Sequence, residues 1–355
     1  MRLPIKTLTI LLAIASSCTP SGRLTQADGE GENSVYYWKT IFCLDSANRS
    51  FIERHHIKRV YLRMFDVSKD EYALEISDRA IPNASVRIGE SDYYLLKDSL
   101  NGMEFIPVVY IELDALKAMS GHENTLASNI VTRVRNMCQY NGLPNVRELQ
   151  MDCDWTASTE ESFFKLCDSV KQNIDSLRLS WHLSSTIRLH QLSRKIPPVD
   201  KGVLMVYNTG TFSNPDAANS ILDARDVKPY LKHLPAYPLH LDVAYPTYSW
   251  QLLFRKRQFI GLLNGMNLSD STLFTRKSAN VYVARRDIPH NNRLIRTGDT
   301  VREETSDYEE IAKVKDLIEK SLRGRHHLNI LYHLDSKNLS NYTPDEIDNI
   351  LSSHR

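Results

Sequence analysis

Short apolar runs recur along the chain from residue 35 onward, and most are followed by a stretch whose apolar positions repeat with helical spacing. Runs rich in β-branched and aromatic residues are typical of buried strands, whereas a repeat of three to four is typical of one helix face. We predict eight strands, at residues 35–42, 59–65, 104–111, 148–153, 177–184, 202–208, 239–245 and 328–333. We predict helices at residues 47–56, 124–140, 158–174, 224–231, 250–263, 307–322 and 344–351.

Alternation of strands and helices indicates βα units around a parallel sheet. Eight strands in a body spanning residues 35–355 favour an α/β fold, a (β/α)8 TIM-type barrel with loop insertions, over an open doubly wound sheet. No GxGxxG or GxxxxGK[ST] sequence follows any predicted strand, so no nucleotide cofactor is expected.

Two regions depart from this alternation: residues 67–102, which we expect to fold over the strand-end face as a loop excursion, and residues 264–304. At about residues 264–304, two strand-like runs flank Pro289-His290-Asn291-Asn292, which predicts an inserted hairpin region. Insertions after barrel strands commonly shape the substrate cleft. Surface decoration is an equally good explanation, because long loops tolerate neutral change.

The N-terminus has the pattern of an export signal. Arg2 and Lys6 precede an apolar stretch at residues 8–14 that is too short to span a bilayer, and Ser16-Ser17 lead to Cys18. This arrangement resembles the lipobox of bacterial lipoproteins, although Ala15 stands where Leu is more common. The resemblance implies a signal peptide at 1–17 and lipidation of Cys18, and an ordinary secretory signal is the alternative.

Residues 18–34 are poor in apolar side chains and are expected to form a flexible tether. The protein would then reside in the bacterial cell envelope, on the outer-membrane, periplasmic or surface side. The lipid on Cys18 would be its only membrane contact.

Charge and cysteine content exclude several partners. The chain has 44 basic and 43 acidic residues, a formal net charge of +1, so no overall field would attract nucleic acid. The remaining cysteines match no zinc spacing, and we expect neither a metal site nor a disulfide-dependent fold. We interpret them mainly as small buried side chains, with one optional disulfide among Cys43, Cys138, Cys153 and Cys167.

The stretch 146–156, VRELQMDCDWT, is the strongest candidate for chemistry. Asp152 and Asp154 are two residues apart, so on a strand they point to the same face. At the carboxyl end of a barrel strand such a pair would lie on the active-site face. Helix capping is the alternative, because Thr156 or Ser158 could cap the helix that follows. A helix cap needs only one residue, so capping would leave at least one of the two acids without a role.

This strand end resembles the D-x-x-D-x-D-x-E motif of glycoside hydrolase family 18, the chitinases and endo-N-acetylglucosaminidases. Asp152 and Asp154 match the second and third acids, Leu149 replaces the first, and Thr156 stands at the position of the catalytic Glu. The sixth strand ends in Met205-Val206-Tyr207-Asn208, which is similar to the family's Met-x-Tyr-Asp. A closer likeness is to an uncharacterised group of bacterial lipoproteins thought to be barrels of the same superfamily.

In the chitinase mechanism, which this resemblance implies, an acid protonates the glycosidic oxygen while the neighbouring Asp orients the substrate's acetamide. Threonine does not supply that proton at neutral pH. Either catalysis has been lost, or Asp152 and Asp154 work with another carboxylate. The candidates at other predicted strand ends are Asp66, Glu112, Asp114, Asp242 and Asp335.

Aromatic residues accompany the same predicted strand ends. Sugars pack their C–H faces on aromatic rings while polar groups bind their hydroxyls, although ordinary core packing is the alternative for each ring. The expected glycan-binding residues are Tyr207, Asn208, Trp155, Tyr245, Trp250, Glu112 and Asp335, with Trp38 and Tyr248 nearby. We therefore expect a lipid-anchored protein that binds or hydrolyses a glycan, and the alternative is a non-catalytic envelope-assembly or scaffold lipoprotein.

Overall fold

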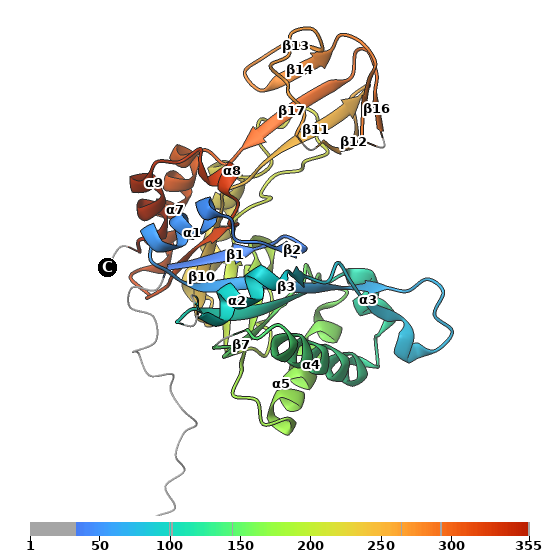
Figure 1. Cartoon of the computed structure of the whole chain (residues 1–355), viewed down its shortest axis with the longest axis vertical. Helices are drawn as coiled ribbons and strands as arrows, with labels where there is room; N and C mark the ends of the chain where they lie inside the picture. Colours follow the sequence, from blue (N-terminus) through green and yellow to red (C-terminus); the bar gives the residue numbers. More distant parts are fainter. Residues whose placement is uncertain are drawn as a thin grey trace, which may run out of the picture. The chain divides into compact units, whose positions relative to one another are not determined.

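Eight parallel strands close into a barrel in the computed structural model, which describes residues 33–353 apart from Ser99, Asn101, Pro144, Asn264 and Asn292. Each barrel strand pairs in parallel with its neighbour. The strand at Asn33–Tyr37 pairs with the strand at Ile57–Lys69, and this pairing closes the ring (Figure 1). The predicted (β/α)8 barrel is confirmed. In spatial order the strands are β1 (Asn33–Tyr37), β3 (Ile57–Lys69), β6 (Glu104–Ile111), β7 (Glu148–Asp152), β8 (His182–Arg188), β9 (Lys201–Met205), β10 (Leu241–Pro246) and β18 (Asn329–Tyr332).

Amphipathic helices surround the barrel. Their apolar faces repeat at helical spacing and are buried, as in Leu126, Ile130 and Val134 of α4. Local capping fixes several helix starts: Asp45 caps α1, and Thr343 forms a capping box with Glu346 at the start of α9. The longer helices are α1 (Ser46–Arg54), α2 (Glu90–Asp98), α4 (Glu123–Tyr140), α5 (Glu160–Ser176), α7 (Tyr308–Leu322) and α9 (Pro344–Leu351).

Shorter elements complete the connections. The strand β4 (Ala80–Asn83) pairs antiparallel with the end of β3, and β2 (Ile41–Phe42) pairs with β5 (Arg87–Ile88). The helical turns are η1 (Ile76–Asp78), α3 (Leu113–Ala118), η2 (Leu189–Ser193), α6 (Ala224–Val227), η3 (Lys228–Ala236) and α8 (Ser336–Leu339).

One strand lies later in the chain than predicted. The helix α5 continues to Ser176, Arg178 follows with a left-handed φ of 53°, and β8 runs from His182 to Arg188 instead of over 177–184. The apolar residues Leu177 and Leu179, which suggested an earlier strand, lie instead in the connection. As a result Arg188, and not Ser184, stands at the carboxyl end of this strand.

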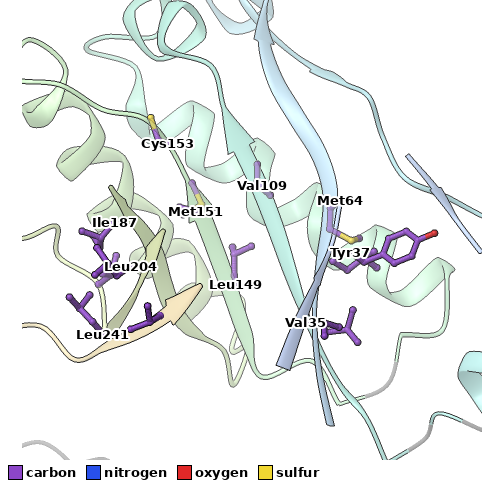
Figure 2. Close-up of a cluster of buried hydrophobic side chains, with 14 of the residues drawn as sticks. Val35, Tyr37, Met64, Val109, Leu149, Met151, Cys153, Ile187, Leu204 and Leu241 are labelled. Carbon is purple, nitrogen blue, oxygen red and sulfur yellow. The ribbon is translucent and has the colours of Figure 1, made fainter. Parts of the chain in front are cut away.

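Alternation along the strands divides the core into two layers. Outward side chains such as Val35, Leu149 and Ile187 join the large cluster between the barrel and the helices (Figure 2). Inward side chains such as Tyr36, Val203 and Ile330 form a separate cluster inside the barrel. Cys138, Cys153 and Cys167 are buried free thiols and Cys43 is an exposed one, so the optional disulfide is absent among these four residues.

A network of charged side chains fills the barrel interior where the strands begin. Arg59 lies 2.9 Å from Glu104 and 3.4 Å from Glu148, and Lys201 lies 2.8 Å from Glu148. Asp242, near the start of β10, belongs to this network through Lys201 at 3.9 Å. The expectation that Asp242 stands at the active-site end is therefore wrong.

The segment after β10 forms an antiparallel insertion. Its five-stranded sheet has the order β12 (Gln258–Leu263), β11 (Ser249–Arg255), β17 (Thr300–Thr305), β14 (Val281–Ala284) and β13 (Phe274–Arg276). A hairpin of β15 (Ile288–His290) and β16 (Arg293–Ile295) accompanies it (Figure 1). The insertion thus begins at Ser249, fifteen residues before the expected start at about residue 264.

The helix predicted over 250–263 is wrong, because this segment is the β11–β12 hairpin. Leu252 and Phe254 point to one face of the sheet, and the residues between them point to the other. Arg255 pairs with Gln258 across a two-residue loop. Both loop residues, Lys256 and Arg257, adopt left-handed φ angles of 48° and 67°. This is the backbone of a tight hairpin turn, but it lacks the Asn-Gly pair that would have revealed it.

The N-terminal expectations fall mostly outside the described residues. The signal peptide, the lipidated Cys18 and the tether up to residue 32 belong to that part of the chain. The strand β1 begins at Asn33, so Asn33 and Ser34 belong to the barrel and not to the tether. Among the described helices, none combines the length and apolar character needed to cross a membrane.

Candidate functional site

The two acids at the end of β7 lie on one side and share a cation, Arg188. Gln150 and Asp152 point into the barrel because Leu149 and Met151 point outward into the large cluster. Nη2 of Arg188 lies 2.9 Å from Oδ1 of Asp152, and its Nε pairs with Asp154. The hydroxyl of Thr186 donates a 2.6 Å hydrogen bond to Asp152. The guanidinium therefore bridges the acids that the sequence places together.

Burial and charge act in opposite directions on Asp152. Burial raises the pKa of this carboxyl, the Arg188 charge lowers it, and the nearby Asp154 raises it again. The net direction is upward from the ordinary value. Burial also raises the pKa of Tyr110, and the charges of Asp154 and Asp152 add to that increase. Tyr110 therefore faces the acid pair from the end of β6.

Neither acid caps a helix. The helix α5 begins at Glu160 with Thr159 in the cap position, and Thr156 hydrogen-bonds to the Ser158 hydroxyl at 3.0 Å. The capping alternative for the acid pair is thus excluded. Thr156 offers only a hydroxyl at this strand end.

Aromatic rings from several barrel strands gather beside the acids. The rings of Tyr207 and Tyr332 stack with centroids 4.5 Å apart, and Tyr248 meets Tyr207 edge-on at 6.0 Å. Trp38 lies 5.6 Å from Tyr332, and Trp250 lies 5.6 Å from Tyr248. We call these five half-buried rings the aromatic cluster. Their partly exposed faces offer the kind of surface on which sugar rings pack.

Two arginines lie against this cluster. The Arg188 guanidinium lies 6.0 Å from the centre of the Tyr207 ring, and that of Arg63 lies 5.4 Å from the Trp38 ring. Arg63 also pairs with Asp66, three residues before the end of β3. Cations, acids and rings thus meet at one end of the barrel, which we call the mouth.

The insertion contributes to the mouth through Trp250. Its indole Nε1 donates a 2.6 Å hydrogen bond to Glu304 of β17, and Glu304 also accepts from the Ser220 hydroxyl at 2.6 Å. Nε of Arg302 donates to the other oxygen of Glu304 at 2.7 Å. Tyr248, just before β11, donates to Asn208 at 2.6 Å. The buried Glu304 therefore fixes one side of the mouth.

Two predicted binding residues lie in the core instead. Trp155 is fully buried, with ring contacts to Phe163 and Phe164 of α5. Tyr245 is fully buried in the large cluster between barrel and helices. Both point outward from the barrel, because strand alternation places them on the helix-facing side, so their assignment to ligand binding is wrong.

Glu112 and Asp335 stand at strand ends, as expected, but each has a local partner. Glu112 accepts a 2.7 Å hydrogen bond from Ser68. Asp335 caps α8 through the Asn338 amide and forms a 2.6 Å ion pair with Lys39. The helix cap and the ion pair therefore explain the presence of Asp335 without a bound ligand.

Sequence reasoning missed Arg188, Arg63, Tyr110 and Tyr332. Arg188 was missed because the strand boundary was placed four residues early. Tyr332 lies within a predicted strand and would have been found by asking which residues of that strand point inward. Within the described ranges, no group of three or more His, Cys, Asp or Glu side chains is arranged to hold a metal ion.

An open concavity of about 560 Å³ lies elsewhere, beside β4 and α4. Its lining has one charged side chain, Arg133, and no converging acids. We place the candidate site at the mouth because polar groups and rings converge there. The lining residues of the concavity are Ala80, Pro82, Asn129, Thr132, Arg133, Asn136, Met137 and Tyr140.

Comparison with known proteins identifies the fold. No protein-family model matches the chain, and no curated protein sequence matches it. Among solved structures, the C-terminal domain of a putative chitinase from Desulfitobacterium hafniense has a TM-score of 0.53 at 10% identity, covering 91% of this chain and 100% of that domain. The chain thus has a chitinase-like TIM-barrel fold, and at this identity the similarity establishes the fold alone.

Two further solved structures have TM-scores just below 0.5. The spore cortex-lytic enzyme SleL of Bacillus cereus has a TM-score of 0.49 at 13% identity, covering 90% of this chain and 75% of the enzyme. A human pseudo-chitinase described as retaining chitooligosaccharide binding has a TM-score of 0.49 at 10% identity, covering 90% of this chain and 98% of that protein.

Proposed function

We propose that this chain is a cell-envelope lipoprotein that binds a glycan at the mouth of its barrel without chitinase-type hydrolysis. The observation that carries the proposal is the meeting of the aromatic cluster with Asp152, Asp154 and Arg188 at one end of the barrel. Rings supply the packing surface for the apolar faces of a sugar. The charged groups and Asn208 supply hydrogen bonds for its hydroxyl and amide groups.

Binding is favoured over hydrolysis because the acids at the mouth, among the residues that the structure describes, are already engaged by partners. The Thr156 hydroxyl is too weak an acid to protonate a glycosidic oxygen at neutral pH, and Asp154 is paired with Arg188. The other mouth acids are also engaged: Asp66 with Arg63, and Asp335 with Lys39. Glu112 accepts a hydrogen bond from Ser68. Each of these carboxylates is thus occupied by a partner from the protein itself, which favours a binding role over proton donation.

The lipoprotein part of the proposal rests on the sequence before the barrel. Arg2, Lys6, the apolar stretch at 8–14 and Cys18 follow the export pattern. Lipidation would hold the protein on a membrane with about 0.8 kcal/mol for each buried CH₂ group. In cells, Cys18→Ser should move the protein from the membrane fraction to the soluble fraction or leave it unprocessed. Unchanged membrane partitioning of the variant would contradict lipidation.

A glycan array tests the binding function directly. The chain carrying Cys18→Ser is screened for bound glycans, and each bound glycan is assayed for new reducing ends. We expect binding, no reducing-end release, and loss of most binding in Tyr207→Ser and Asp154→Asn. Tyr140→Ser is the matched control, because Tyr140 is 86% exposed on α4 and takes no part in the aromatic cluster. Release of reducing ends, or full binding by both mouth variants, would refute the proposal.

A further inference from the structure

The insertion is far more basic than the rest of the chain. Between Ser249 and Thr305 there are ten Lys and Arg residues and five Asp and Glu residues, a formal charge of +5. The whole chain has a formal charge of only +1, so the remainder is acidic on balance. The near-neutral total therefore conceals a strongly cationic insertion.

Many of these cations have no acidic partner. Arg255 pairs with Asp299, Arg302 with Glu304, and Arg257 with Asp216. Seven exposed cations of the insertion form no ion pair with any residue in the described ranges: Lys256, Arg276, Lys277, Arg285, Arg286, Arg293 and Arg296. Their charge is available to an anionic partner.

Hydrogen bonds hold part of this charge on one compact surface. Arg255 in β11 donates to the Leu294 carbonyl at 2.9 Å, and Arg293 donates to the Ile260 carbonyl at 2.8 Å. The amide of Arg296 donates to Asp299 at 2.8 Å, and Asp299 in turn pairs with Arg255. These bonds tie the β11–β12 turn, the edge strand β12 and the hairpin strand β16 together.

Large apolar side chains are exposed on the same elements. Ile260 and Leu262 of β12 are 37% and 46% exposed, and Leu294 of β16 is 46% exposed. We call this surface the basic tip and define it by Lys256, Ile260, Leu262, Arg293, Leu294 and Arg296. An exposed aliphatic residue is unremarkable alone, but three beside unpaired cations make an amphipathic surface.

We propose that the basic tip binds the surface of a bilayer that contains anionic lipids. Cations near an anionic headgroup layer are attracted to it, and exposed leucine and isoleucine side chains gain free energy by entering the interface. A hydrophilic anionic polymer would use the cations but not the aliphatic side chains. The proposal goes beyond glycan binding, because none of these residues belongs to the mouth. It would orient the protein by a contact additional to the lipid on Cys18.

Vesicle sedimentation of the full chain carrying Cys18→Ser tests this, because that substitution removes any attached lipid. We expect binding to vesicles of phosphatidylcholine with phosphatidylglycerol and not to phosphatidylcholine alone. Each basic residue near an anionic surface contributes about fivefold to the partition coefficient of the protein onto vesicles. Lys256→Ser combined with Arg296→Ser should therefore lower this coefficient about 30-fold. The matched control, Arg49→Ser with Lys232→Ser, removes two exposed cations outside the insertion and should change it little.

The apolar half of the tip is tested separately. Leu262→Ser with Leu294→Ser should lower vesicle binding by about tenfold. Full binding by this variant would refute the bilayer proposal and favour an anionic polymer as the partner. Absence of binding by the parent, or equal losses in the tip and control pairs, would also refute it. Tyr207→Ser should keep vesicle binding, and the tip variants should keep glycan binding, so failure of either proposal is recognisable.

Discussion

At the scale of single residues, the mouth depends on one cation. Arg188 contacts Asp152 and Asp154, and its guanidinium also lies over Tyr207. Two neighbouring carboxylates would repel each other and favour protonation of one of them. Arg188 offsets part of this repulsion: its charge lowers the pKa of Asp152, while burial and Asp154 keep that pKa above its ordinary value.

Arg188→Gln should destabilise the fold by about 3 kcal/mol at neutral pH, because it leaves a buried carboxylate without its cation. Burial already raises the pKa of Asp152, and loss of Arg188 would raise it further. Between the ordinary pKa of Asp and the raised folded value, the folded state binds more protons than the unfolded state. Stability then falls as the pH rises.

The free energy of unfolding that Arg188→Gln loses relative to the parent should therefore be smaller near pH 4 than near pH 7, as measured by urea unfolding. Arg225→Gln is the control, because Arg225 pairs with Asp223 at the surface and should show little effect at either pH. An equal deficit at both pH values would show that Arg188 does not act on the ionisation of Asp152.

Asp242 provides a test at the other end of the barrel. Burial alone would raise the pKa of Asp242, but the hydrogen bond with His240 and the Lys201 charge lower it to about 2. For an acid with a lowered pKa, the stabilisation is complete above the ordinary value and disappears as the pH falls through the folded value. Asp242→Asn should cost about 2 kcal/mol near pH 7, and less near pH 2, in urea unfolding. A cost independent of pH would contradict this ion-pair role.

At the scale of elements, the hairpin β11–β12 connects the insertion to the mouth. It begins just after Tyr248, carries Trp250, and turns at Lys256 and Arg257, both left-handed. The insertion thus supplies one ring of the site and carries the basic tip at the turn. The hairpin can do both because it follows β10 directly, so one end lies at the mouth and the other end carries the turn of the basic tip.

The turn offers a stability test. Arg257 has a φ of 67°, which costs about 1 kcal/mol for a residue with a side chain and little for glycine. Arg257→Gly should therefore be more stable than Arg257→Ala by about 1 kcal/mol in urea unfolding. The alanine variant is the matched control, because both substitutions remove the Asp216 ion pair. Equal stability of the two variants would show that the turn is not left-handed at this residue.

At the scale of the whole molecule, local patterns sufficed for the barrel and failed for the insertion. The strand at 104–111 and the helix at 344–351 match the structure end to end, because the strand is a continuous buried apolar run and a capping box marks the helix start. The segment 250–263 satisfied both helical and strand spacing, and only pairing with β17 decides between them.

The candidate site was predictable in part. Asp152, Asp154, Tyr207, Asn208 and Trp250 are at or beside the mouth because they follow strand ends. The direction in which a side chain leaves the barrel depends on strand alternation, and this placed Trp155 and Tyr245 in the core. A partner from a neighbouring strand, such as Arg188, is set by the register between β7 and β8, which no local pattern encodes.

The central claim is that a glycan binds intact at the barrel mouth, and a crystal structure of the complex with a glycan retained in the array screen tests it most directly. We predict an uncleaved sugar packed on the aromatic cluster, with polar groups within hydrogen-bonding distance of Asp154 or Asn208. A glycan bound in the concavity beside α4, or a cleaved sugar at the mouth, would contradict it.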